Sequence, residues 1–153
     1  MNFVNLKTNT MEFFLREMNY EDASQVMHLS QQLGYNISLV DTQKNIEAIA
    51  KQNNSKAFVA VHKNKVVGWI SVAYNVTIAS LPHCEIRGLV VDEAYRKNNL
   101  GKMLVEKVKQ WCKEKNCNRL RLRCNVIRKE THAFYTHLGF DEKKEQKVFE
   151  IDV

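Results

Sequence analysis

One amphipathic segment between two strand-like segments limits most strongly what this chain can fold into. From Leu100 to Lys115, apolar residues recur at helical spacing while the charged residues lie mostly off that stripe. The segment Glu85–Val91 before it is rich in β-branched residues, and Arg119–Cys124 after it alternates apolar side chains with three arginines. A strand, a helix and a second strand in this order predict a crossover that joins two parallel strands. The apolar stripe of the helix comprises Leu104, Val108, Trp111 and Cys112.

The rest of the chain predicts an antiparallel beginning and a short α-β end. We expect a strand at Phe13–Glu17, then a helix capped by Asn19 and stopped by Gly34, and a second helix capped by Thr42. Two strands follow at Ala57–Val61 and Val66–Ala73, joined by a turn at Lys63-Asn64. After the crossover we expect a helix at Thr131–Leu138, ended by Gly139, and a last strand at Lys147–Asp152. These elements predict an α/β fold with a mixed, mostly antiparallel sheet flanked by helices. One domain over residues 11–153 is expected, preceded by a short polar extension at residues 1–10.

Composition narrows the class of protein. A length of 153 residues with 44% hydrophobic content fits one globular domain, and no apolar run approaches the roughly 20 residues that span a bilayer. The first ten residues lack the apolar stretch of a signal peptide, and the four cysteines form no C-x-x-C pair. We therefore expect a cytoplasmic protein with free thiols, no membrane contact and no structural zinc, and we assign no metal-binding residues.

The positive charge is concentrated in one part of the chain. The formal net charge is +6, yet the stretch from Arg96 to Lys129 alone holds twelve Lys and Arg against two Glu, so the remainder is mildly acidic. Such a stretch is compatible with a solvated helix face, a nucleic-acid-binding patch or a pocket for a polyanionic cofactor. Composition does not choose among these three.

The loop that leads into the long helix favours an anion. Arg96, Lys97 and Lys102 lie around the helix start, where the first backbone N–H groups have no partner within the helix and the macrodipole is positive. Gly101 lets a ligand approach the backbone closely, and Asn99 is of a type that tolerates a left-handed conformation. The loop therefore predicts phosphate binding, with a basic helix start that binds nothing as the alternative.

Two runs of the chain are similar to signatures of the GNAT superfamily of N-acetyltransferases. Residues 85–104 resemble the acetyl-CoA-binding motif Arg/Gln-x-x-Gly-x-Gly/Ala, with Arg96 in its first position and Gly101 in its last, while Asn99 replaces the usual first Gly. Residues 125–140 resemble the second signature, which ends in Phe-Tyr-x-x-x-Gly-Phe. Both motifs occur at the spacing and in the element order of the family.

The resemblance extends over residues 11–153 and implies the GNAT fold, in which two central strands splay apart to admit acetyl-CoA as co-substrate. The pyrophosphate is then expected on backbone N–H groups of residues 97–102, and the pantetheine arm along residues 89–91. Residues expected to bind the cofactor are Leu89, Val90, Val91, Arg96, Lys97, Asn98, Asn99, Leu100, Gly101, Lys102, Asn125 and His132.

Acetyl transfer to an amine poses two proton-transfer problems. An amine with a pKa of about 10.4 is almost fully protonated at pH 7, so a base is useful, and the departing thiolate needs an acid. Glu85 is the candidate base, because apolar neighbours make a carboxylate a better proton acceptor and its position matches a catalytic Glu of several GNAT enzymes. A structural ion pair with Arg87 is the alternative for Glu85. Tyr135 matches the family's general acid, with a core tyrosine beside Phe134 as the alternative.

The acceptor is expected to be the primary amine of a small molecule. Similarity of residues 96–101 and 125–135 to the aminoalkylphosphonate N-acetyltransferase branch allows a small anionic amine, and an aminoglycoside-like polyamine is equally admissible. The alternatives are a protein or peptide acceptor, a nucleic-acid-binding module and a cofactor-binding module without catalysis. A homodimer is also compatible with the sequence, whereas nucleic acid is not the expected partner. Candidate substrate contacts are His83, which is also an alternative base, and Tyr35, Trp69 and Tyr74, for which the core or the cleft wall is the other interpretation.

Overall fold

The computed structural model describes residues 4–8 and 11–153 and divides them into two units. The first, called the sheet unit here, ends at Leu122, and the second, the C-terminal unit, is Arg123–Val153. The expected extension at residues 1–10 lies partly outside the described residues, but Val4–Thr8 forms a strand, β1, that the sequence did not predict. The single domain expected over residues 11–153 stays a prediction.

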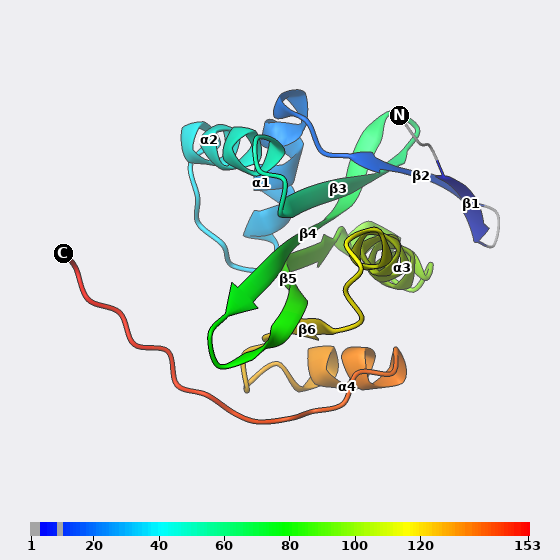
Figure 1. The fold of residues 1–153 in the computed structure, drawn as a ribbon. Helices are drawn as coiled ribbons and strands as arrows, with labels where there is room; N and C mark the ends of the chain where they lie inside the picture. Colours follow the sequence, from blue (N-terminus) through cyan, green and yellow to red (C-terminus); the bar gives the residue numbers. More distant parts are fainter. Residues whose placement is uncertain (1–3, 9–10) are drawn as a thin grey trace. The chain divides into compact units, whose positions relative to one another are not determined.

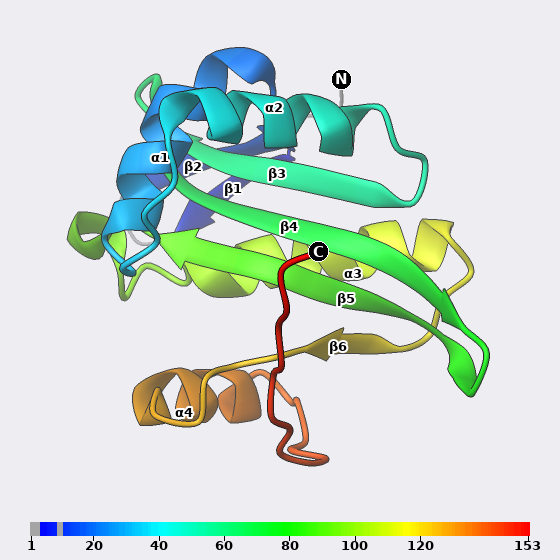
Figure 2. The same ribbon diagram turned by 90° about the vertical axis from the view of Figure 1, so that its left-hand side faces the viewer.

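The sheet unit is built on one six-stranded sheet whose strands follow each other in chain order. After β1 come β2 (Met11–Glu17), β3 (Ser55–His62), β4 (Lys65–Thr77), β5 (Ser80–Val91) and β6 (Leu120–Leu122). Neighbouring strands are antiparallel except for β5 and β6, which run parallel and are shown side by side in Figure 2. The predicted mixed sheet and its parallel crossover are therefore confirmed.

Helices cover both faces of this sheet. In Figure 1, α1 (Ala23–Gln31) and α2 (Leu39–Ala50) lie on one face and α3 (Leu100–Glu114) lies on the other. Val26 and Leu29 of α1 pack against Val59 and Val90 of the sheet. Each of the four residues of the predicted α3 stripe is buried, which confirms the amphipathic interpretation of that helix.

Local sequence explains two of the connections. The turn between β3 and β4 lies at Lys63-Asn64 as predicted, and both residues have positive φ, 47° and 63°, which a two-residue hairpin turn requires. The predicted cap at Thr42 is wrong. Ser38 caps α2 instead, because its Oγ accepts a hydrogen bond from the Asp41 N–H at 3.0 Å, while Thr42 lies inside the first turn and donates to the Ser38 carbonyl.

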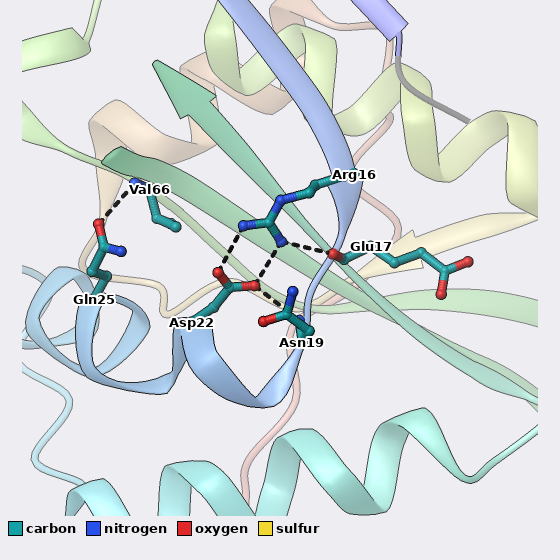
Figure 3. Close-up of polar contacts among 6 residues, drawn as sticks. All are labelled: Arg16, Glu17, Asn19, Asp22, Gln25 and Val66. Atoms are coloured by element: carbon teal, nitrogen blue, oxygen red, sulfur yellow. Dashed lines mark hydrogen bonds and ion pairs between the residues drawn. The ribbon is translucent and has the colours of Figure 1, made fainter. Parts of the chain in front are cut away.

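A buried ion pair anchors the start of α1 to β2. The Arg16 guanidinium donates two hydrogen bonds of 2.8 Å to the carboxylate of Asp22, which also accepts one from the Asn19 backbone N–H (Figure 3). These bonds raise the pKa of Arg16, and partial burial opposes the shift. One turn further, the Gln25 side chain accepts a hydrogen bond from the Val66 N–H, so that α1 is tied to two strands.

The C-terminal unit contains one regular element, α4 (Lys129–His137). The chain leaves this helix through Gly139, whose φ of 95° favours glycine. The strand predicted at Lys147–Asp152 is wrong: a strand forms only against a hydrogen-bonded neighbour, and the described residues pair none with this segment. The strand predicted at Arg119–Cys124 is confirmed only over the three residues of β6.

Three cysteines meet inside the sheet unit. Cys84, Cys112 and Cys117 are buried and free. Burial raises the pKa of Cys84 and of Cys112, and the adjacent Cys112 and Cys117 add to the shift of Cys84. Such thiols are poor nucleophiles at neutral pH, so they act as core residues.

No helix in the described part of the chain is long and apolar enough to cross a membrane.

Candidate functional site

The loop at the end of β5 is held in shape by its own side chains. Asp92 caps the short 3₁₀ helix Glu93–Tyr95 by accepting a hydrogen bond from the Ala94 N–H at 3.1 Å. Burial of this carboxyl opposes ionisation, but the bonds from Ala94 and Gln32 and the nearby Lys65 ammonium outweigh it and lower the pKa of Asp92. Asp92 is therefore a charged structural cap that fixes how the chain leaves β5.

After this cap, the backbone turns sharply into α3. Lys97 and Asn99 have positive φ of 67° and 59°, and Asn99 is the N-cap residue of the helix. Asn99 thus adopts the left-handed conformation that asparagine tolerates. The first helical bond runs from the Met103 N–H to the Asn99 carbonyl, so the preceding N–H groups lie at an open helix N-terminus. Arg96 donates from Nε to the Val91 carbonyl at 3.2 Å, which holds its side chain against the end of β5.

The end of β5 has an edge without a partner strand. The parallel ladder with β6 pairs only Cys84–Ile86 with Leu120–Leu122, whereas β5 continues to Val91. Over residues 88–91, β5 is paired with β4 on one side, and no strand of the described chain pairs with its other side. Apart from the Val91 carbonyl, which accepts from Arg96, backbone groups along this edge are available to a ligand that carries its own amides. The edge leads directly to the loop and the N-terminus of α3.

Glu85 is buried in the middle of β5, yet it is bonded to polar neighbours. Its Oε2 accepts a hydrogen bond from Asn75 Nδ2 at 3.3 Å and lies 3.2 Å from Arg87 Nη1. Arg87 also donates to the Asn75 side-chain oxygen at 3.1 Å, which closes a three-membered network. The ion pair weighed from the sequence therefore exists, and it holds the Glu85 carboxylate on the sheet surface.

Strand register decides which side chains share a face with Glu85. Glu85 pairs with Ala73 and His83 pairs with Asn75, so these residues point to the same side of the sheet as Trp69. His83 is buried within β5, not in a loop, and its Nδ1 lies 3.4 Å from the Leu81 carbonyl. This polar surface beside Glu85 is called the Glu85 face below.

The Trp69 indole lies over Gly88. A Cβ at residue 88 would come within 2.5 Å of the indole ring, so the close packing of Trp69 requires glycine there. Its buried indole Nε1 has no hydrogen-bond partner among the residues that the structure describes. A buried donor of this kind is a candidate ligand contact.

Tyr74 pairs with Cys84 and so lies on the opposite face, and Tyr35 is 48% exposed after α1. Of the expected substrate residues, the sheet therefore brings only Trp69 and His83 to the Glu85 face.

Within the C-terminal unit, residues of the second signature contact one another. The Tyr135 ring packs edge-on against Phe134 and Phe140, with centroids 5.1 and 5.7 Å apart. One turn earlier, His132 donates from Nε2 to the Asn125 carbonyl at 2.8 Å. The two expected cofactor residues of this unit are thus bonded to each other, and the Tyr135 ring is in contact with two aromatic neighbours.

Asn75 and Arg121 were missed as site residues. In the parallel ladder Arg121 pairs with Glu85, and Asn75 contacts Glu85 directly. The alternation of residues 119–124 grouped Arg121 with the other arginines of that segment. Its position beside Glu85 depends on the pairing between β5 and β6, which the alternation does not give.

Comparisons with known proteins agree on one family. A sequence model of the acetyltransferase (GNAT) family matches residues 19–140. An uncharacterized N-acetyltransferase of Chlorobaculum tepidum is 27% identical over 129 residues, 84% of this chain and 75% of the relative.

Solved structures of two acetyltransferases show the same fold. An aminoglycoside N-acetyltransferase, AAC(6')-Iy, determined with CoA, is 18% identical with a TM-score of 0.84 over 97% of this chain and 100% of its own. Glucosamine-6-phosphate N-acetyltransferase of Arabidopsis thaliana is 24% identical with a TM-score of 0.78, over 92% and 99%. At these identities the structures establish the fold alone.

Proposed function

The chain belongs to the acetyltransferase (GNAT) family, and from this premise we propose that it moves the acetyl group of acetyl-CoA to the primary amine of a small molecule. One structural observation carries the proposal: the unpaired edge of β5 leads into an open helix N-terminus with basic side chains around it. A pantetheine arm carries amides and CoA carries phosphates, so one ligand satisfies both features. AAC(6')-Iy, the aminoglycoside acetyltransferase with this fold, was determined with CoA.

The cofactor is assigned to the loop and the strand edge together. The pyrophosphate is placed on the N–H groups of residues 97–102, where the helix dipole favours negative charge, with Arg96 beside it. The pantetheine amides are placed against the backbone of Leu89–Val91. Asn125 and His132 are assigned to the same cofactor from the C-terminal unit. Bound there, acetyl-CoA supplies an activated acetyl group.

The reaction we propose is a direct attack. The amine nitrogen bonds to the thioester carbonyl carbon, the carbon–sulfur bond breaks, and the amide and CoA are released. Glu85 takes the proton that leaves the amine, directly or through a water molecule, and the Tyr135 hydroxyl protonates the departing thiolate. Support for Glu85 is its position as a carboxylate held on the sheet face by Asn75 and Arg87.

The reaction itself is tested by product formation. Purified protein is mixed with acetyl-CoA and a panel of small primary amines, and release of the CoA thiol is followed together with the mass of the amide. We expect thiol release that depends on at least one amine. If no small amine reacts while acetyl-CoA still binds, the acceptor is a protein or peptide and the small-molecule proposal is wrong.

The base role of Glu85 is tested by the pH profile of Glu85→Gln. Glutamine keeps the size and the hydrogen bond from Asn75 but cannot accept the proton at neutral pH. We expect the largest loss of kcat/KM near pH 7, about 10²-fold, with partial recovery as the pH rises and more of the amine is already neutral. Asn75→Ala serves as the control, because it removes a neighbour and leaves the carboxylate. An equal loss at every pH would assign Glu85 a structural role.

A further inference from the structure

We propose that the acceptor amine also carries an anionic group, and that Arg121, with Arg87, binds this anion on the Glu85 face of the sheet. The inference rests on the proposed function and names the chemical class of its acceptor. Two classes were compatible with the sequence, a small anionic amine and a polycationic amine. The structure separates them through the charges that the strand pairing sets around Glu85.

Strand pairing places Arg121 next to Glu85. In the β5–β6 ladder Glu85 is the register partner of Arg121, and residues paired in this way point to the same face. Leu120 and Leu122, which flank Arg121, point to the opposite face, where α3 packs. The Arg121 side chain is exposed, so its guanidinium is accessible to a ligand that reaches Glu85.

The Glu85 face is net positive. Glu85 is the only carboxylate on this face among the described residues of β4, β5 and β6, and its charge is already paired with Arg87. The Arg87 side chain remains 53% exposed, so it keeps donors for a ligand. The backbone of Arg119 also lies next to β5, because its carbonyl accepts a hydrogen bond from the Cys84 N–H. A second positive charge on the acceptor would be repelled here, whereas a phosphate or carboxylate would be attracted.

Two further groups on this face, the Arg121 guanidinium and the Trp69 indole, are donors as well. A guanidinium has five N–H donors in a planar fork and no acceptor, a geometry that matches a phosphate or carboxylate. The buried Nε1 of Trp69, which lacks a partner among the described residues, adds a donor further along β4. A ligand rich in acceptor oxygens satisfies these groups, and a ligand that offers mainly ammonium donors leaves them unsatisfied.

Matched probes test this inference, each pair differing by one phosphate. The pairs are glucosamine 6-phosphate with glucosamine and 2-aminoethyl phosphate with 2-aminoethanol, and neamine represents a polycationic amine. We expect kcat/KM for at least one phosphorylated amine to exceed that of its neutral partner by tenfold or more. Arg121→Gln should reduce this ratio to within about threefold and leave KM for acetyl-CoA unchanged, while Arg121→Lys keeps part of the preference.

Lys113→Gln is the matched control, because it removes one positive charge from the exposed last turn of α3 and should keep the preference. Calorimetric binding of the same probes to the protein loaded with CoA gives a readout without turnover. Turnover with no phosphate preference, or a preference for neamine, overturns the inference and leaves the acetyltransferase intact. Phosphate-dependent binding that Arg121→Gln abolishes, without any turnover, supports the inference and counts against the proposed reaction. Binding of none of the probes overturns the inference.

Discussion

Replacing Tyr135 by phenylalanine is expected to lower kcat by about 10²-fold, with little change in the KM for acetyl-CoA. The change removes one hydroxyl and keeps the ring. The edge-on contacts of the ring with Phe134 and Phe140 are kept in the variant. A phenol with a pKa near 10 is protonated at neutral pH and can donate to a thiolate whose conjugate thiol has a pKa near 8.5. Without it, CoA must leave as a thiolate or take its proton from water.

Steady-state kinetics with acetyl-CoA and a reactive amine measure this effect. The control is Tyr20→Phe, which makes the same chemical change at a residue 44% exposed in the turn before α1 and should leave kcat unchanged. Circular dichroism of both variants checks that α4 is retained. Unchanged turnover in Tyr135→Phe would remove Tyr135 from the acid role. A raised KM for acetyl-CoA with normal kcat would instead make it a binding residue.

The loop that we assign to the cofactor was largely predictable, because its chemistry is local. Arg96, Asn99 and Gly101 lie within six residues, and a strand before them with an amphipathic helix after them fixes their setting. Asn99 illustrates why: an asparagine between a strand and a helix tolerates the left-handed turn, and the structure has it there with φ of 59°. Such features depend on neighbours in sequence and can be inferred from them.

The environment of Glu85 was not predictable in the same way, because it depends on pairing between strands. Strict alternation would group residue 85 with residues 87, 89 and 91. The register shift between β4 and β5 instead aligns Gly88 with Ser71 and Val90 with Trp69, so Val90 turns toward α1 and Trp69 covers Gly88. The strand predicted at Lys147–Asp152 was wrong for a related reason, since a pattern alone does not supply a neighbour.

Asp22→Asn is expected to lower the free energy of unfolding by about 2–3 kcal/mol. The Asp22 side chain is 5% exposed and accepts three hydrogen bonds of 2.8 Å, two from Arg16 and one from the Asn19 N–H. Asparagine keeps one acceptor oxygen and turns an NH₂ group toward these donors, which leaves a guanidinium without its counter-charge. Breaking a buried pair costs about 3–5 kcal/mol. Since Arg16 is 20% exposed, water recovers part of that cost.

Urea unfolding followed by circular dichroism measures the loss. Glu17→Gln is the matched control, because it makes the same carboxylate-to-amide change in the ion pair with Lys56, where both side chains are substantially exposed. That variant should change stability by less than about 0.5 kcal/mol. A double-mutant cycle with Arg16→Gln should show that the two changes are not additive, because either one alone leaves the other group unpaired. If Asp22→Asn costs no more than Glu17→Gln, the tie between β2 and α1 does not stabilise the sheet unit, and the helix is held by its apolar contacts with Val59 and Val90.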